Sequence, residues 1–200
     1  MARPIFLVAA VLAAGAGLAA ALTLSRDAGT DCFDSAVAGA SIGGPFTLVD
    51  QTGQTVTDAQ VIDRPTLVYF GYTFCPDICP VDVSRNLAAL DLAAQSGVDA
   101  QAVMVTVDTA RDTPQVLADY AANLGGGLIG LTGSDAQIRA AADAYRVVYS
   151  RSGEDPDYYL MNHSAFTYLM LPETGFATFF RRETTPQEIA DQLVCAAGGD

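Results

Sequence analysis

Apolar and polar residues follow one another along this chain in patterns that predict both strands and helices. Residues 66–70 and 102–107 form two largely apolar runs, which are typical of strands buried on both faces of a sheet. Between them, apolar residues recur at helical spacing over residues 81–95. Two buried strands joined by a helix form a β–α–β unit, so the pattern predicts parallel pairing at the centre of a sheet.

Turn and capping residues predict the remaining elements. Short glycine-containing turns divide two predicted hairpins, which pair residues 46–49 with 54–57 and residues 165–170 with 176–180. Capping residues precede three further predicted helices, at residues 114–124, 135–145 and 186–196. The whole pattern predicts an α/β domain with a mixed sheet and helices on both faces.

The N-terminal segment follows a different pattern. Residues 5–24 carry no charge and, at about 1.5 Å per helical residue, would span roughly 30 Å, one hydrocarbon thickness. This length favours an uncleaved transmembrane helix over a signal peptide cleaved near residues 19–21. Arg3 precedes the span and an acidic region follows it, which places that region outside the cytoplasm. We expect a single-pass protein of a bacterial inner membrane with its C-terminal domain in the periplasm.

These features divide the chain into a membrane anchor (residues 1–26), a small, polar, glycine-rich tether (residues 27–44) and one domain (residues 45–200). The chain has 200 residues, 50% of them hydrophobic, which suffices for one well-buried domain. It has 23 acidic and 10 basic residues and a net charge of −13. Because each phosphate contact needs a cation, this balance excludes nucleic acid as a partner.

Candidate chemistry is concentrated in residues 71–80, GYTFCPDICP. The segment lies between a predicted strand and its helix, where open α/β sheets place functional sites. Pro76 and Pro80 disfavour helical backbone in the residue before each, so Cys75 and Cys79 are expected in the turn ahead of the helix, where its N-terminus favours thiolates. The CxxxC spacing lets two sulfurs converge on a metal, but it is equally consistent with an ordinary disulfide.

His163 is the only histidine and lies just ahead of a predicted strand. By residue type alone, a lone histidine in such a place is more often a solvated loop residue than a ligand. Two thiolates and an imidazole would nevertheless form a soft site that suits Cu(I) and accepts Cu(II). Spacing along the sequence does not establish that His163 reaches the cysteines.

Three segments resemble, in order, the signature regions of the Sco/SenC family of copper-binding proteins. They are GYTFCPDICP at residues 71–80, VDTARDTP at residues 107–114 and YLMNHSAFTYLM at residues 159–170. The resemblance covers about residues 43–195 and extends to the membrane anchor. Three motifs in the same order make it highly specific.

The resemblance implies a thioredoxin-like fold with Cys75, Cys79 and His163 as copper ligands. It also implies a metallochaperone, rather than an enzyme, that delivers copper to the binuclear copper centre of cytochrome c oxidase. The expected partners are the copper-accepting subunit of that oxidase and, in addition, other copper chaperones or thiol oxidoreductases.

Other functions remain open on the residues alone. A thiol–disulfide oxidoreductase would use Cys75 and Cys79 as catalytic residues on a partner protein, although the spacing is not CxxC and Phe74 stands where thioredoxins usually have tryptophan. A peroxidase of the same fold would need threonine where Tyr72 stands. A zinc site with an open position would also accept two cysteines and a histidine.

Two departures from the family pattern concern the surroundings of the site. Thr109 and Ala110 replace the proline and glutamate that usually follow the first aspartate of the acidic turn. Asn162 replaces the aspartate that usually precedes the ligand histidine, which would lower the basicity of the imidazole and alter partner docking. The acceptor protein is therefore less firmly indicated than the metal site.

Five more residues within these motifs have simple structural interpretations. Asp77 and Asp112 are expected as loop carboxylates on a solvated surface, whereas Asp108 closes a buried strand and is equally suited to supporting the site. Tyr72 and Phe74 are expected to pack around the thiols.

The other two cysteines, Cys32 and Cys195, share no spacing with the site motifs. In an oxidising compartment an even pair left over suggests a structural disulfide, here between the tether and the last helix. Two free thiols are the alternative.

Overall fold

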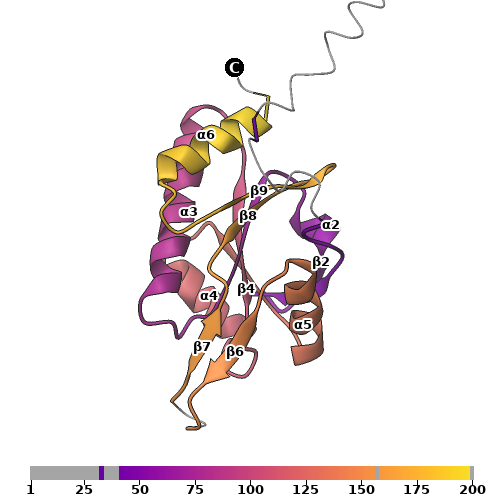
Figure 1. The fold of residues 1–200 in the computed structure, drawn as a ribbon, viewed down its shortest axis with the longest axis vertical. Coiled ribbons are helices and arrows are strands. Elements are labelled where there is room, and N and C mark those ends of the chain that lie inside the picture. Colours follow the sequence, from indigo (N-terminus) through magenta and orange to yellow (C-terminus); the bar gives the residue numbers. More distant parts are fainter. Residues whose placement is uncertain (1–31, 34–40, 156–157, 199–200) are drawn as a thin grey trace, which may run out of the picture.

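The computed structural model describes residues 32–33, 41–155 and 158–198. Its centre is a seven-stranded mixed sheet with the order β2-β1-β5-β4-β3-β8-β9 (Figure 1). The strands are β1 (Thr47–Asp50), β2 (Thr55–Thr57), β3 (Thr66–Gly71), β4 (Gln101–Thr106), β5 (Leu128–Thr132), β8 (Thr167–Leu171) and β9 (Gly175–Phe180). β3, β4 and β5 pair in parallel and the other neighbours pair antiparallel, so the expected mixed sheet is present. The apolar pattern did not predict β5.

Helices cover both faces of this sheet, as the pattern predicted. α3, α4 and α6 lie on one side, and α2 and α5 lie on the other (Figure 1). The helices are α2 (Asp58–Val61), α3 (Ile78–Gln95), α4 (Pro114–Asn123), α5 (Asp135–Ala144) and α6 (Pro186–Ala196). The side chains of Thr113, Ser134 and Thr185 accept hydrogen bonds from the first turns of α4, α5 and α6, which confirms the predicted caps.

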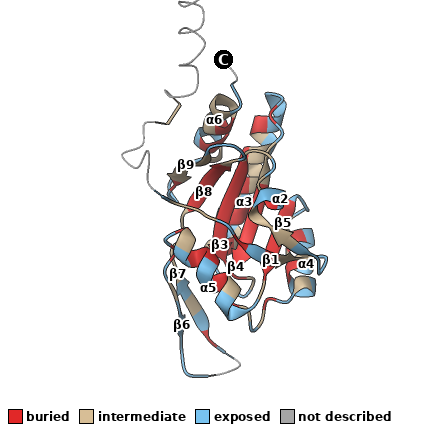
Figure 2. Ribbon diagram, turned by 90° about the vertical axis from the view of Figure 1, so that its right-hand side faces the viewer, coloured by how far each residue is buried: buried red, intermediate tan, exposed pale blue. Residues whose placement is uncertain are grey.

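The core lies between the central strands and the helices. Its packing holds the ends of these strands in place. Every residue of β3 is buried, as are five of the six residues of β4. Figure 2 shows these strands as a continuous buried layer. Burial of apolar surface is the main stabilising contribution to such a layer, so the residues that leave the end of β3 start from a rigid base.

A separate two-stranded sheet projects from one end of the domain (Figure 2). It consists of β6 (Tyr149–Ser152) and β7 (Leu160–His163), and exposed residues predominate in it. The sequence pattern did not predict this hairpin. His163 is therefore the last residue of a strand and not a loop residue ahead of β8.

The start of α3 differs from the prediction and changes the setting of one cysteine. The helix begins at Ile78 rather than at residue 81, so Cys79 lies in its first turn. The expectation that both cysteines precede the helix is wrong for Cys79. Pro80 is accommodated because proline lacks only an N–H that has no helical partner in the first turn. Cys75 lies in the loop, as expected.

The predicted anchor, residues 1–26, lies outside the described residues, and so does most of the predicted tether, residues 27–44. Within the part of the chain that the structure describes, no helix has the length and apolar character needed to cross a membrane. Near the end of the predicted tether, the backbone N–H of Gly43 donates to Ala144 O at 2.9 Å, which attaches this segment to α5.

Candidate metal centre

The end of β3 and the first turn of α3 approach each other closely at Gly71. A Cβ atom at this position would lie 2.7 Å from Cε1 of Tyr69 and 3.2 Å from Sγ of Cys79. Only glycine leaves this space free, so Gly71 allows the thiol of Cys79 to lie against the end of the strand.

Cys75 is partly buried in the loop between β3 and α3. The backbone N–H of Cys79, in the first turn of the helix, donates to Sγ of Cys75 at 3.3 Å. Burial raises the pKa of Cys75, but donors on Cys79, Asp77 and Ile78 outweigh it, and the net pKa lies below the usual value. The local structure therefore favours a thiolate at Cys75.

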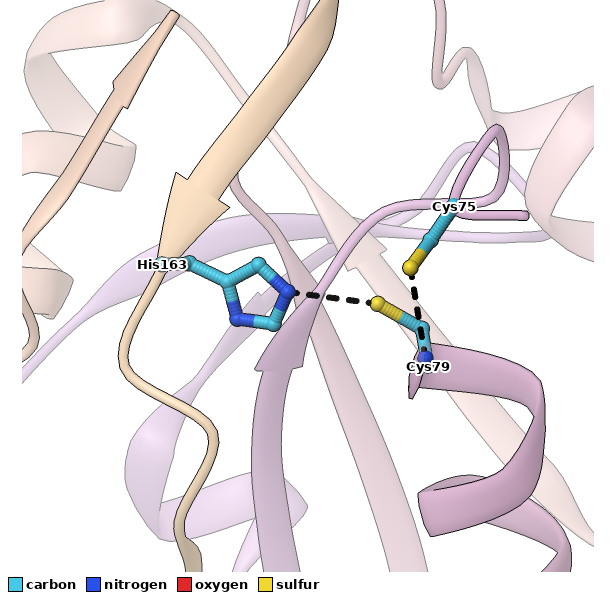
Figure 3. A group of neighbouring side chains, drawn as sticks. All are labelled: Cys75, Cys79 and His163. Carbon is cyan, nitrogen blue, oxygen red and sulfur yellow. Dashed lines mark hydrogen bonds between the residues drawn. The ribbon is translucent and has the colours of Figure 1, made fainter. Parts of the chain in front are cut away.

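Cys79 has the opposite character, because its side chain is fully buried. Burial, and next the neighbouring Cys75, raise the pKa of the Cys79 thiol well above its usual range. Its Sγ lies 3.3 Å from Nε2 of His163, which points toward it from the end of β7 (Figure 3). The pair thus combines one thiol whose pKa is lowered with one whose pKa is raised, and a bound metal ion would displace the proton of the second.

His163 is held in the tautomer that a metal requires. Its Nδ1 lies 3.1 Å from the carbonyl oxygen of Ser164, and a carbonyl only accepts, so Nδ1 carries the proton. The lone pair is therefore on Nε2, which faces Cys79. Burial lowers the pKa of His163 below 6.5, which favours the neutral imidazole. The rings of Tyr69 and Tyr72 meet the imidazole edge to face, with centroids 6.0 and 5.9 Å away.

The three donor atoms fit one soft metal ion. Sγ of Cys75, Sγ of Cys79 and a ring nitrogen of His163 all lie within 4.8 Å of one another. Two ligands at about 2.3 Å from a shared ion, the usual metal–sulfur length, would be at most about 4.6 Å apart, so small movements suffice. The loop between β3 and α3, residues 72–77, carries Cys75 and is called the thiol loop. A cleft of about 310 Å³ opens beside Cys75 and His163 and is lined by both the thiol loop and β7. The centre is therefore reachable from one side.

Comparison with known proteins decides the family. The SCO1/SenC family model matches residues 35–198. This chain belongs to the SCO1/SenC family. Protein SenC of Rhodobacter capsulatus is 49% identical over 185 residues, which is 90% of this chain and 83% of SenC. The resemblance drawn from the three motifs is thus confirmed.

Solved structures agree with this SCO1/SenC assignment. The copper-bound ScoI of Arabidopsis thaliana is 39% identical and superimposes with a TM-score of 0.74, covering 78% of this chain and 98% of that one. The copper-bound ScoI of Bradyrhizobium japonicum is 37% identical, with a TM-score of 0.67, covering 76% of this chain and 97% of that one. These matches confirm the expected thioredoxin-like α/β fold, and both relatives hold the metal expected here.

The aspartates expected near the site have different surroundings. Asp77 is exposed, as predicted. The prediction for Asp112 is wrong: its carboxylate is fully buried and accepts hydrogen bonds from Thr73 and Thr106. Burial raises the pKa of Asp112 against the effect of these bonds. Such a carboxylate is retained inside because donors surround it, and the motif spacing did not reveal them.

Asp108 is also buried, with 3% of its surface exposed, and accepts a hydrogen bond from the hydroxyl of Tyr159 at 2.6 Å. Tyr72 packs beside the site as expected. Phe74 does not pack around the thiols as expected, because 56% of its surface is exposed and its ring meets the guanidinium of Arg111.

Sequence reasoning missed a buried polar pair behind Cys79. The hydroxyl of Tyr69 donates to Oδ2 of Asp82 at 3.2 Å, and Asp82 is 2% exposed. Burial raises the pKa of Asp82, although Arg85 and Arg182 lie 3.8 and 3.7 Å from it. The spacing of three residues from Cys79 to Asp82 would place both on one helical face, and this was the available signal.

Cys32 and Cys195 form a disulfide with a Cα–Cα distance of 5.8 Å. It joins the N-terminal segment to α6, away from the thiol loop. Cys75 and Cys79 are free thiols. The structure therefore separates the four cysteines into a covalent link and a pair available for chemistry.

Proposed function

We propose that this protein is a copper metallochaperone that binds one copper ion through Cys75, Cys79 and His163. The observation that carries the proposal is the convergence of these donors from two separate elements, with all donor atoms within 4.8 Å. Soft thiolates favour Cu(I) and zinc over hard cations such as Mg²⁺ and Ca²⁺, and the imidazole suits either copper oxidation state. The copper-bound relatives support this choice of metal.

The same geometry suits a carried ion. His163 and Cys75 line the cleft, so an acceptor could approach them while Cys79 holds the ion from inside the domain. Because a ligand thiol must be deprotonated, copper binding releases the proton of Cys79, and reprotonation would assist release of the ion.

We also propose an acceptor for the copper and a cellular location for the protein. A solved relative, 23% identical, is described as a member of the Sco family of cytochrome c oxidase assembly proteins. The copper-accepting subunit of that oxidase is therefore the proposed destination, with other copper chaperones or thiol oxidoreductases as additional partners. We propose that residues 5–24 anchor the protein in a bacterial inner membrane with the domain in the periplasm, on the basis of their uncharged length and the preceding Arg3.

Thiol–disulfide exchange is the second candidate function. The free pair of Cys75 and Cys79, with a lowered pKa at Cys75, has the features of a redox dithiol. The 23%-identical relative is described as having a disulfide switch. In this alternative the protein would reduce cysteines of a partner before metal insertion.

Copper titration of the reduced protein tests the site. We expect one copper per chain, and we expect Cys75→Ser and Cys79→Ser each to abolish tight binding, because each removes a soft anionic donor. The control is Cys32→Ser/Cys195→Ser, which removes the same atoms away from the site and should keep the full stoichiometry. Full stoichiometry in either single variant would refute the proposed ligands.

His163→Ala separates the two candidate functions. The imidazole supplies one of three strong donors, but it contributes to a Cys75–Cys79 disulfide only through a modest effect on thiol pKa. We expect much weaker copper binding with a dithiol–disulfide midpoint close to that of the unmodified protein. A strain with His163→Ala that assembles cytochrome c oxidase normally at limiting copper, while Cys75→Ser does not, would favour the thiol function.

A further inference from the structure

The copper ligands come from two parts of the fold that no sheet pairing joins. Cys75 and Cys79 follow β3 in the seven-stranded sheet, whereas His163 ends β7 in the two-stranded sheet. Within the described residues the two sheets share no paired strands. β7 continues through residues 164–166 into β8, which pairs with β3, so the chain itself brings His163 near the end of β3. Side chains that contact both parts then set how closely His163 and the cysteines approach.

The loop after β4, residues 107–113, makes the contact with the thiol loop. The carboxylate of Asp112 accepts the backbone N–H of Thr73 at 3.0 Å and its hydroxyl at 2.6 Å. It also accepts the hydroxyl of Thr106, at the end of β4, at 2.6 Å. Thr73 stands two residues before Cys75, so this buried carboxylate fixes the entry to the thiol loop.

The same loop contacts the hairpin through Tyr159, which directly precedes β7. The hydroxyl of Tyr159 donates to Asp108 at 2.6 Å. Nε of Arg111 donates to the other oxygen of Asp108 at 2.5 Å. Tyr159 is 6% exposed, so its ring is an anchor of the hairpin rather than a surface group.

Arg111 contacts both ligand-bearing parts at once. Its guanidinium carbon lies 3.7 Å from the ring centroid of Tyr159 and 4.7 Å from that of Phe74, the residue before Cys75. The ring of Tyr72, which meets the imidazole of His163 edge to face, lies 5.9 Å from the same carbon. One planar cation thus stacks against the segments on either side of the metal centre.

Burying the guanidinium of Arg111 is energetically unfavourable unless contacts inside the protein compensate for the lost water. Its side chain is 17% exposed, and its Nη1 and Nη2 are buried with no hydrogen-bond partner among the described residues. An arginine on a surface loop would normally keep these donors in water. Here the aromatic faces and the ion pair with Asp108 are what hold it inside.

We propose that Arg111 is a positioning residue of the metal centre. Arg111 clamps the β6–β7 hairpin to the thiol loop and so keeps His163 close enough to Cys79 for both to bind the same ion. The effect of Arg111 on copper binding rests on the proposed function, but the contacts that form the clamp are present without the metal. Arg111 does not contact the ligand atoms; it acts through Tyr159 and Phe74. Residues that orient ligands from outside in this way typically change metal affinity by about 10- to 100-fold when removed.

The first test uses the copper-free full-length protein with Cys75 and Cys79 reduced. Because His163 is the only histidine, its ring gives a single set of NMR resonances. We expect Arg111→Gln to shift or broaden these resonances and to speed amide exchange in β7 by about tenfold, since the hairpin loses its contact with the domain. Arg111→Lys should behave like Arg111→Gln, because lysine keeps the charge but has no planar group to lie between two rings.

Arg151→Gln is the matched control. The Arg151 guanidinium stacks on the same Tyr159 ring at 3.9 Å, but Arg151 belongs to β6, and it donates to the backbone oxygen of Asp155 in the loop of the same hairpin. This variant should leave the His163 resonances in place. Unchanged His163 resonances and β7 exchange in a folded Arg111→Gln protein would overturn the proposal, and so would full recovery by lysine.

The second test is copper affinity, where Arg111→Gln should lose about 10- to 100-fold while keeping one ion per chain. Phe74→Ala is an independent variant. Because the Phe74 side chain is 56% exposed, its removal should leave the fold intact, and we expect a smaller loss of copper affinity than in Arg111→Gln. Unaltered affinity in both variants would contradict the clamp. Failure of the unmodified protein to bind copper would instead refute the proposed function, while the copper-free measurements would still decide whether the clamp exists.

Discussion

The seven-stranded sheet and the β6–β7 hairpin hold their parts of the metal centre in different ways. β3 is buried along its whole length, and the cysteines follow from its end and from α3, which packs on the sheet. In β6 and β7 exposed positions predominate, yet the hairpin supplies His163 (Figure 2). The two candidate sulfur ligands are thus held by the core, whereas the candidate nitrogen ligand is held at the edge of the domain by a few side-chain contacts and by the short connection to β8.

This difference suggests a division of roles at the site. If the three side chains bind copper as proposed, the buried thiol of Cys79 would retain the ion, and His163, on an element with fewer buried contacts, would be the ligand that an acceptor displaces first. Regions with few buried apolar contacts open at lower free energy than core strands. The two regions should therefore differ in how much a substitution in each destabilises the protein.

The largest difference should appear in stability. Leu169 on β8 is fully buried, whereas Leu160 on β7 is 45% exposed. We expect Leu169→Ala to lower the free energy of unfolding by about 2–5 kcal/mol and Leu160→Ala to lower it by less than about 1 kcal/mol. Denaturant unfolding of both variants measures this. Equal losses would show that the hairpin is as integral to the core as the sheet.

A smaller effect is expected at the junction between β3 and α3. Gly71→Ala would bring a methyl group to 2.7 Å from Tyr69 and 3.2 Å from Cys79, so we expect a loss of about 1–3 kcal/mol and weaker copper binding. Gly44→Ala is the control, because its Cβ would meet only Ala144, at an ordinary 3.4 Å. Thermal unfolding measures the loss of stability, and copper titration measures the change in affinity. A Gly71→Ala protein as stable as the control would contradict the tight approach.

The smallest effect concerns pH. Burial lowers the pKa of His163 below 6.5, so the unfolded chain binds a proton there more readily than the folded one. Its contribution to stability is fully present above the unfolded-state pKa and is lost as the pH falls through the folded-state pKa. Between about pH 7.5 and about pH 5.5, copper-free wild-type protein should therefore lose more stability than His163→Gln. Parallel pH profiles of the two proteins would show that the imidazole is as accessible to solvent as in the unfolded chain.

The sequence predicted the elements whose signal is local. The central strands β3 and β4 are unbroken apolar runs, and the capping residues of α4, α5 and α6 stand where the helices begin. β5 was missed because it is short, contains Gly130 and follows three glycines. β6 was missed because YSRS has too little apolar character to mark a buried face.

For the site, residue chemistry and the family resemblance predicted which side chains matter, but not how they meet. Cys79 was expected ahead of the helix, since the proline rule describes helix interiors better than first turns. Asp112 was expected in solvent, because its donors Thr73 and Thr106 come together only in the folded chain. The approach of His163 to Cys79 likewise depends on tertiary packing, which no spacing along the chain encodes.

X-ray absorption of the copper-loaded, reduced protein counts the donor atoms around the ion, so it tests the proposed three-ligand centre. We expect two sulfurs and one imidazole nitrogen per copper, with the nitrogen lost in His163→Ala and both sulfurs retained there. A spectrum of the unmodified protein with fewer than two sulfurs, or one unchanged by His163→Ala, would contradict a centre built from Cys75, Cys79 and His163.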